Sequence, residues 1–157
     1  MKLLDKTGRK ALLLADNSLS WRKRKESYLD GVLLGLLEGT VGKMKYQYNV
    51  KGGRIDFRHG GTNPAFVELV VIKHGVEPYA KSNASELWKL TRIKHAKARR
   101  RVLLILDASG RKPKTKRNLK RSYNKIGYGR GRGIREKITI MYVHPDKESS
   151  FKFIWGK

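Results

Sequence analysis

Two acidic side chains stand in segments whose other residues predict the interior of a β-sheet. Asp56 lies in the extended segment Arg54–Arg58, and Glu68 lies twelve residues later in an almost continuous apolar run over 65–73. An ionised carboxylate in such surroundings is costly unless it is paired or bound to a metal ion. Two converging carboxylates supply the hard oxygen ligands that Mg²⁺ prefers, and Mg²⁺ can activate water and stabilise charge on a phosphate. Asp56 and Glu68 are therefore candidate metal ligands.

A structural role for the two acids is the alternative. Asp56 could pair with Arg54 or Arg58 of its own segment, and Glu68 with a cation on a neighbouring strand. Carboxyls within about 5 Å of each other that face a basic cleft would favour a metal-dependent nuclease. Acids on opposite faces of the sheet would favour a protein that only binds. The sequence has no P-loop and no cysteine, and its four histidines are too widely spaced to be metal ligands.

The pattern of apolar and turn residues predicts the elements that hold these acids. The predicted order is a helix over 20–38, strands over 43–50, 54–58 and 65–73, a helix from Asn83 to about Arg101, a strand over 102–106, a basic helix over 115–126, and strands over 137–143 and 151–155. Asn83 and Glu86 have the spacing of a capping box, the run 10–15 fits a strand or a helix, and Gly127–Gly133 predicts a flexible loop. Strands separated by helices predict one α/β domain over 1–157, with a central mixed sheet flanked by helices.

The order of helix, three strands, helix and strand, with Asp on the second strand and Glu inside the third, resembles the core of the PD-(D/E)XK nuclease superfamily. The resemblance covers about Ser20–Asp107 and places Ile55-Asp56 at the Pro-Asp position and Glu68-Leu69-Val70 at the (D/E)XK position. It implies a nuclease-like fold, with Asp56 and Glu68 as catalytic residues that hold Mg²⁺. Val70 stands where the motif has its catalytic lysine, which is a departure from the pattern.

Another element can supply the lysine. Leu87, Leu90, Lys94 and Ala98 fall near one face of the predicted helix by steps of three and four residues. Lys94 is therefore the candidate third catalytic residue, which would orient or activate the attacking water. Its alternative role is that of one more contact to a phosphate. Lys73 is disfavoured because strand alternation points it away from the Glu68 face.

Positive charge is concentrated in the second half of the chain. The whole sequence carries 37 Lys and Arg against 13 Asp and Glu, and the segment 89–137 alone carries 19 basic and two acidic residues. Such clusters neutralise phosphates, so we expect nucleic acid as the partner, DNA before RNA. The candidate contacts are Arg92, Lys97, Arg99, Arg100, Arg101, Arg111, Lys112, Lys114, Lys116, Arg117, Lys120, Arg121, Arg130 and Arg132. Tyr123 and Tyr128 could stack on unpaired bases or pack the basic helix on the sheet.

The sequence also excludes several classes of protein. Without cysteine there is no disulfide framework, and no apolar run approaches the roughly 18–20 residues that span a bilayer. The first residues lack the pattern of a signal peptide. We therefore expect a cytoplasmic protein without a membrane partner, nucleoid-associated if its source is bacterial, with a homodimer left open.

The predicted function is nucleic-acid binding with metal-dependent endonuclease activity at Asp56, Glu68 and Lys94. The first alternative is a non-catalytic DNA- or RNA-binding protein, for example one associated with the ribosome. The second is an adaptor that binds acidic proteins through the same positive charge.

Overall fold

The computed structural model describes residues 2–16, 26–42, 44–50, 53–72, 83–93, 100–128 and 137–156. Its strands form one six-stranded sheet in the order β1-β2-β3-β4-β5-β6. The elements along the chain are α1 (Lys2–Asp16), α2 (Glu26–Val41), β1 (Lys45–Val50), β2 (Gly53–His59), β3 (Ala65–Ile72), α3 (Ala84–Arg92), β4 (Arg100–Asp107), α4 (Lys116–Tyr128), β5 (Ile138–Val143), the 3-10 helix η2 (Lys147–Ser149) and β6 (Phe151–Trp155).

The sheet is mixed. β1, β2 and β3 pair antiparallel, β3, β4 and β5 pair parallel, and β6 returns antiparallel to β5. A parallel pair needs a crossover between its strands, and here α3 connects β3 to β4 while α4 connects β4 to β5. The prediction of an α/β architecture with a central mixed sheet is therefore confirmed.

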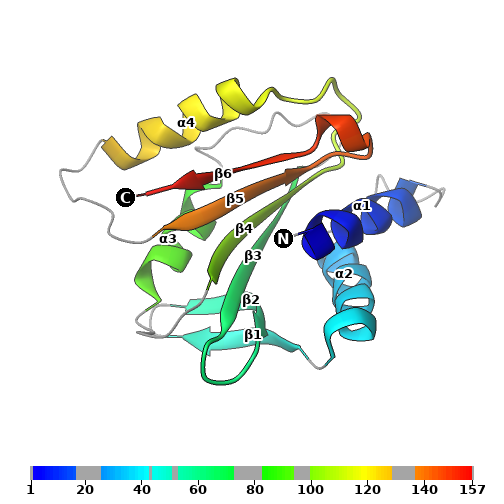
Figure 1. Cartoon of the computed structure of the whole chain (residues 1–157), viewed down its shortest axis with the longest axis vertical. Helices are drawn as coiled ribbons and strands as arrows, with labels where there is room; N and C mark the ends of the chain where they lie inside the picture. The colour runs from blue at the N-terminus through cyan, green and yellow to red at the C-terminus, as the bar shows by residue number, and fades with distance from the viewer. Residues whose placement is uncertain are drawn as a thin grey trace.

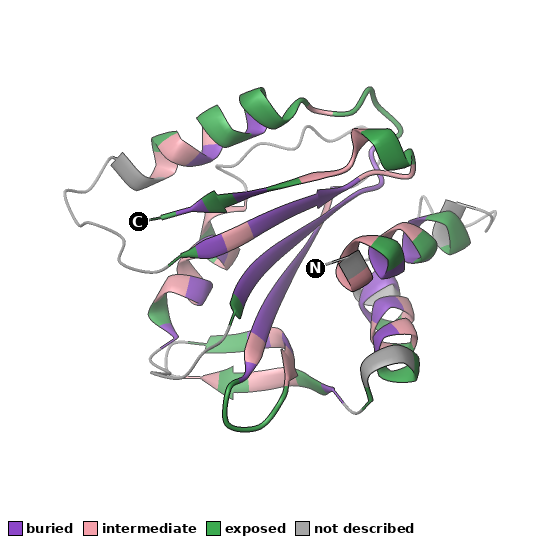
Figure 2. Ribbon diagram, in the orientation of Figure 1, coloured by how far each residue is buried: buried purple, intermediate pink, exposed green. Residues whose placement is uncertain are grey.

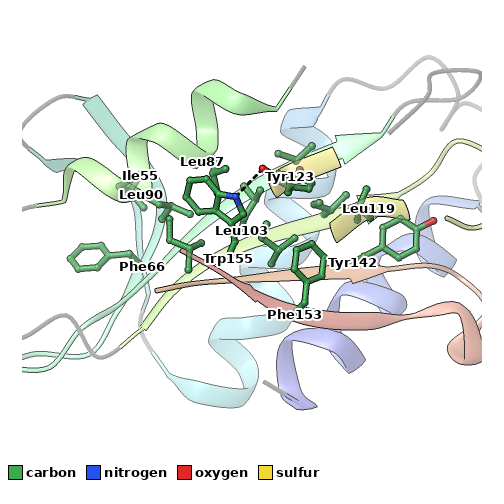
Figure 3. Packing of buried hydrophobic residues seen from close by; sticks show 14 of the residues in the cluster. Ile55, Phe66, Leu87, Leu90, Leu103, Leu119, Tyr123, Tyr142, Phe153 and Trp155 are labelled. Atoms are coloured by element: carbon green, nitrogen blue, oxygen red, sulfur yellow. Dashed lines mark hydrogen bonds between the residues drawn. The ribbon is translucent and has the colours of Figure 1, made fainter. Parts of the chain in front are cut away.

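Helices cover both faces of the sheet (Figure 1). One core cluster joins α3 and α4 to the sheet, and its largest buried side chains include Tyr123, Phe66 and Leu87 (Figure 3). Trp155 links β6 to α4 in this cluster, because its Nε1–H donates to the carbonyl of Tyr123 at 2.9 Å. The other cluster joins α1 and α2 to the opposite face, where Leu33 is buried. The strands in the middle of the sheet are buried along almost their whole length (Figure 2).

Helix α1, which with α2 covers the second face of the sheet, lies very close to the strands. A Cβ atom added at Gly8 would lie only 2.8 Å from Leu106 Cδ2 on β4, so the glycine permits the contact. The run 10–15, which fits either a strand or a helix in the sequence, lies in this helix. Ala11 and Leu12 are buried there and Leu13 and Leu14 are exposed, as expected for one face of a helix.

The segment after Asn83 differs from the prediction. α3 ends at Arg92, and Arg100 and Arg101 begin β4 instead of continuing the helix. The reason is tertiary: Ala65–Ile72 of β3 pairs residue by residue with Arg100–Asp107, and this ladder outweighs the local helical spacing. The capping box is also wrong, because the Asn83 side chain makes no cap hydrogen bond and Glu86 pairs with Lys89.

Other predicted elements agree in position as far as they are described. α2 and α4 correspond to the helices predicted over 20–38 and 115–126, and residues 20–25 lie outside the described part. Gly127 and Tyr128 complete α4, so the predicted loop does not begin at Gly127, and its residues 129–133 are not described. Within the described ranges, no helix combines the length and the apolar character needed to cross a membrane.

Candidate functional site

The β1–β2–β3 ladder is interrupted at Asp56. The β1–β2 pairs skip from Tyr46–Phe57 to Tyr48–Ile55, and Gln47, opposite Asp56, has a φ of 49°. The Asp56 carboxylate takes over hydrogen bonds at this point. Its Oδ2 accepts from the backbone N–H of Leu69 at 2.8 Å and its Oδ1 accepts from Gln47 Nε2 at 3.2 Å.

The interruption changes which face each side chain of β2 occupies. Residues two apart in a regular strand share a face. Ile55, however, packs in the cluster beneath α3 and α4, whereas Phe57 packs in the cluster beneath α1 and α2. β2 is therefore rotated about its own axis at Asp56, and the carboxylate lies at the turning point between the two cores.

Glu68 stands beside Asp56 on the neighbouring strand. The β2–β3 pairs end at Phe57–Val67, Asp56 and Glu68 are the neighbours of these two residues, and their side chains are hydrogen-bonded. Glu68 has no exposed surface. Burial raises the pKa of Glu68 to about 10, with further contributions from its hydrogen bond with Asp56 and from the negative charge of Asp56. At neutral pH Glu68 is therefore protonated. We call Asp56 and Glu68 the carboxylate pair.

Lys89 of α3 is the cation next to the carboxylate pair. Its Nζ lies 3.2 Å from each carboxylate oxygen of Glu68 and also contacts the carboxylate of Glu86, three residues earlier on the helix. Burial alone would lower the pKa of Lys89, but the hydrogen bond and charge of Glu86 together with Glu68 outweigh it, and the pKa is raised. Lys89 is therefore a charged ammonium in contact with acids from two elements.

A further acid, Asp30 of α2, approaches Asp56 from the other layer. Asp30 is buried, its Oδ2 accepts from the hydroxyl of Tyr46 at 3.2 Å, and its Oδ1 has no hydrogen-bond partner among the described residues. Burial, followed by the negative charge of Asp56, raises the pKa of Asp30 to about 6, and the Tyr46 hydrogen bond opposes this shift. Asp56 thus raises the pKa of one acid on each side of it, Asp30 of α2 and Glu68 of β3.

The sequence interpretation found two of these residues and missed the others. Asp56 and Glu68 do come together, whereas Lys94 lies outside the described residues and Lys89 occupies the place expected for it. Asp30 carried a usable signal, because it shares a helix face with the buried Leu33 and Leu37. Neither alternative partner of Asp56 is realised in the described chain: Arg58 donates to the carbonyl of Gly61 and lies over the Tyr48 ring, and Arg54 is exposed.

The predicted nucleic-acid contacts divide into three groups. Lys97, Arg99, Arg130 and Arg132 lie outside the described residues. Arg101 is buried and its guanidinium donates to the carbonyl of Ile93 at 3.2 Å, so it faces the interior. Lys114 is half-buried, and the remaining candidates are exposed: Arg92, Arg100, Arg111, Lys112, Lys116, Arg117, Lys120 and Arg121.

Most of the exposed candidate contacts, all except Arg92 and Arg100, belong to α4 and the loop before it. Leu119 and Tyr123 are buried against the sheet, and the opposite side of α4 carries the charges. Tyr123 packs the helix rather than offering a stacking face, and burial raises its pKa to about 12. We call the following set the basic surface: Arg111, Lys112, Lys114, Lys116, Arg117, Lys120, Arg121 and Lys125.

A buried polar pair fixes the loop that begins this surface. The Tyr142 hydroxyl on β5 donates to Asp107 at the end of β4 and accepts from the backbone N–H of Lys114 at 3.2 Å. The other Asp107 oxygen accepts from the N–H of Ser109 at 2.9 Å. These bonds hold both ends of the segment 109–114 to the sheet, so its cations project from a fixed backbone.

In the part of the chain that is described, no three His, Cys, Asp or Glu side chains gather closely enough to enclose a metal ion. We compared the chain with protein-family models, with curated proteins and with solved structures, and none of them matches it. Function therefore has to be inferred from the geometry and charge of the site.

Proposed function

We propose that this protein binds nucleic acid and hydrolyses its phosphodiester bonds with a divalent cation held by Asp56 and Glu68. The observation that carries the proposal is the convergence of two acids, from different strands, beside a lysine. Burying two carboxylates side by side is unfavourable unless a cation is available to them. Carboxylate oxygens are the ligands that Mg²⁺ prefers, and Mg²⁺ commonly binds through one or two carboxylates and keeps several waters. A pair of acids therefore fits Mg²⁺ without a third protein ligand.

The order of elements supports the finer fold class that belongs to this proposal. α2, β1, β2, β3, α3 and β4 follow one another with three antiparallel strands and a fourth strand parallel to the third. This is the arrangement on which the resemblance to PD-(D/E)XK nucleases rests. α2 and α3 lie on opposite faces of the sheet, and the two acids occupy its second and third strands (Figure 1).

Each residue has a role in this proposal. Asp56 and Glu68 would hold Mg²⁺, which supplies Lewis-acid stabilisation of the phosphate and a water of lowered pKa. Glu68 would release its proton to solvent in order to serve as an anionic ligand. Lys89, in the role predicted for Lys94, provides a positive charge for the phosphate or orients the water. The basic surface on α4 neutralises backbone phosphates without reading base sequence, and DNA is the expected substrate.

A non-catalytic nucleic-acid-binding protein is the second candidate, and one observation favours it. Lys89 compensates the carboxylates within the folded chain, as a purely structural ion pair would. Under this alternative the basic surface carries the whole function and Asp56 has a structural role, capping the N–H of Leu69.

A cleavage panel separates the two candidates. Duplex, single-stranded and branched DNA and duplex RNA are incubated with the protein in Mg²⁺, in Mn²⁺ and in chelator. We expect cleavage of at least one substrate with metal and none with chelator. Asp56→Asn and Glu68→Gln should abolish cleavage and leave binding near parental, whereas Glu148→Gln, which removes an exposed carboxylate on η2, should leave both unchanged. Intact substrates throughout, with binding retained, would establish the non-catalytic alternative.

A further inference from the structure

Lys89 lies between two carboxylates that differ in burial. Glu68 on β3 is completely buried, whereas the Glu86 side chain on α3 is 29% exposed. α3 itself is anchored by Leu87 and Leu90, both fully buried. The aliphatic part of Lys89 passes the start of β2, with its Cδ 3.7 Å from the position of a Cβ built on Gly53. The helix is thus anchored in the core, and the Lys89 ammonium contacts both acids at once.

A divalent cation on the carboxylate pair would compete with this ammonium. Both need the oxygens of Glu68, and two positive charges on one carboxylate repel each other. The ammonium therefore has to leave Glu68 when the cation binds. Glu86 can receive it without movement of the helix, because side chains three residues apart lie on the same side of a helix and the two groups are already in contact.

We propose that Glu86 is a positioning residue, which takes Lys89 from Glu68 when a divalent cation binds and keeps the ammonium beside the carboxylate pair. This inference rests on the proposed function, since it requires a cation on Asp56 and Glu68. Lys89 then acts in both states of the site. Without metal it donates to Glu68, and with metal it is held by Glu86 next to the bound cation, available to a phosphate.

The test is a double-mutant cycle read by Mn²⁺ binding, measured calorimetrically on the full chain without nucleic acid. Lys89→Met removes the competing ammonium, so Mn²⁺ should bind about tenfold more tightly. Glu86→Gln leaves Lys89 with Glu68 as its sole carboxylate, so Mn²⁺ should bind about tenfold more weakly when Lys89 is present and change by no more than about twofold in the Lys89→Met background. The two backgrounds are compared because the loss of a negative charge near the site would by itself weaken Mn²⁺ binding. That general electrostatic effect would be the same with Lys89 and with Lys89→Met.

Glu86→Asp provides the matched control for charge. It keeps the negative charge but shortens the side chain by one methylene group. The Mn²⁺ affinity of Glu86→Asp should therefore lie between that of the parent and that of Glu86→Gln. An equal effect of Glu86→Gln in both backgrounds would overturn the role of Glu86 and leave the proposed function standing. A parent protein that binds no Mn²⁺, or one whose Mn²⁺ affinity is unaffected by Asp56→Asn, would overturn the proposed function and this inference together.

Discussion

The Lys89 ammonium lies 3.2 Å from both carboxylate oxygens of Glu68, a residue without any exposed surface. This contact joins α3 to the centre of β3, and it brings the cation to the point where Asp56 interrupts the sheet ladder. A buried pair of this kind is costly to desolvate, so its presence alone is weak support for a purely stabilising role. Under the proposed function, the Lys89 ammonium at this contact is exchanged for a divalent cation.

The first prediction concerns Asp30 and pH. The pKa of Asp30 is raised to about 6 in the folded chain from its ordinary value of 3.8, so folding favours the protonated form. Its contribution to stability is complete below about pH 4 and is lost as pH rises through 6. Asp30→Asn keeps an acceptor for Tyr46 but cannot ionise. The variant should therefore gain about 1 to 3 kcal/mol in unfolding free energy over the parent between pH 4 and 7.

The measurement is urea unfolding at several pH values in chelator, so that no metal binds. Glu148→Gln, at an exposed position, is the control and should follow the parent. A difference between Asp30→Asn and the parent that stays constant across this pH range would contradict the buried, ionisable role of Asp30.

The second prediction concerns the basic surface. Lys120 and Arg121 are exposed on α4, and Lys6 and Lys10 are exposed on α1 on the opposite side of the sheet. Neutralising each pair to Gln removes the same net charge. If α4 contacts phosphates, Lys120→Gln/Arg121→Gln should reduce the slope of log affinity against log salt concentration for duplex DNA by about 2. The α1 pair should leave the slope almost unchanged, and equal effects of the two pairs would exclude a specific role for α4.

The third prediction concerns the loop that begins the basic surface. Tyr142→Phe removes the donor to Asp107 and the acceptor for the Lys114 N–H. The loss of buried hydrogen bonds should destabilise the protein by about 1 to 3 kcal/mol. Amide exchange across 109–114 should accelerate more than elsewhere, and DNA affinity should fall. Tyr48→Phe, which removes a hydroxyl from a half-buried tyrosine on β1, should change neither the exchange nor the affinity. Unaltered exchange in Tyr142→Phe would show that the loop is held by other contacts.

Local sequence signals were sufficient for much of the sheet. The Gly-rich turn before β2, the apolar run of β3 and the apolar run of β4 each depend on neighbouring residues, and each element lies close to its predicted position. The end of α3 was predicted incorrectly because Arg100 and Arg101 join a ladder with β3, and that pairing connects residues 35 apart in the sequence. Periodicity does not contain this information.

The same distinction explains the site. Asp56 and Glu68 could be predicted because charged residues in apolar strands are conspicuous. Helical spacing predicts the catalytic lysine on the helix face that includes Leu87 and Leu90, but that face points into the core. Lys89 lies at its flank, where α3 passes over β2 and β3, and its pairing with Glu68 depends on how the helix docks on the sheet. Asp30 interacts electrostatically with Asp56 because α2 packs on the face of the sheet opposite α3, where Asp30 reaches Tyr46 of β1.

The central claim is that Asp56 and Glu68 together bind a divalent cation. Crystals of the protein soaked in Mn²⁺ and measured for anomalous scattering test it most directly. We predict an anomalous peak between the two carboxylates, about 2.1 Å from an oxygen of each, with the Lys89 ammonium moved from Glu68 to Glu86. No peak at this position, with Lys89 still on Glu68 at saturating Mn²⁺, would contradict the claim.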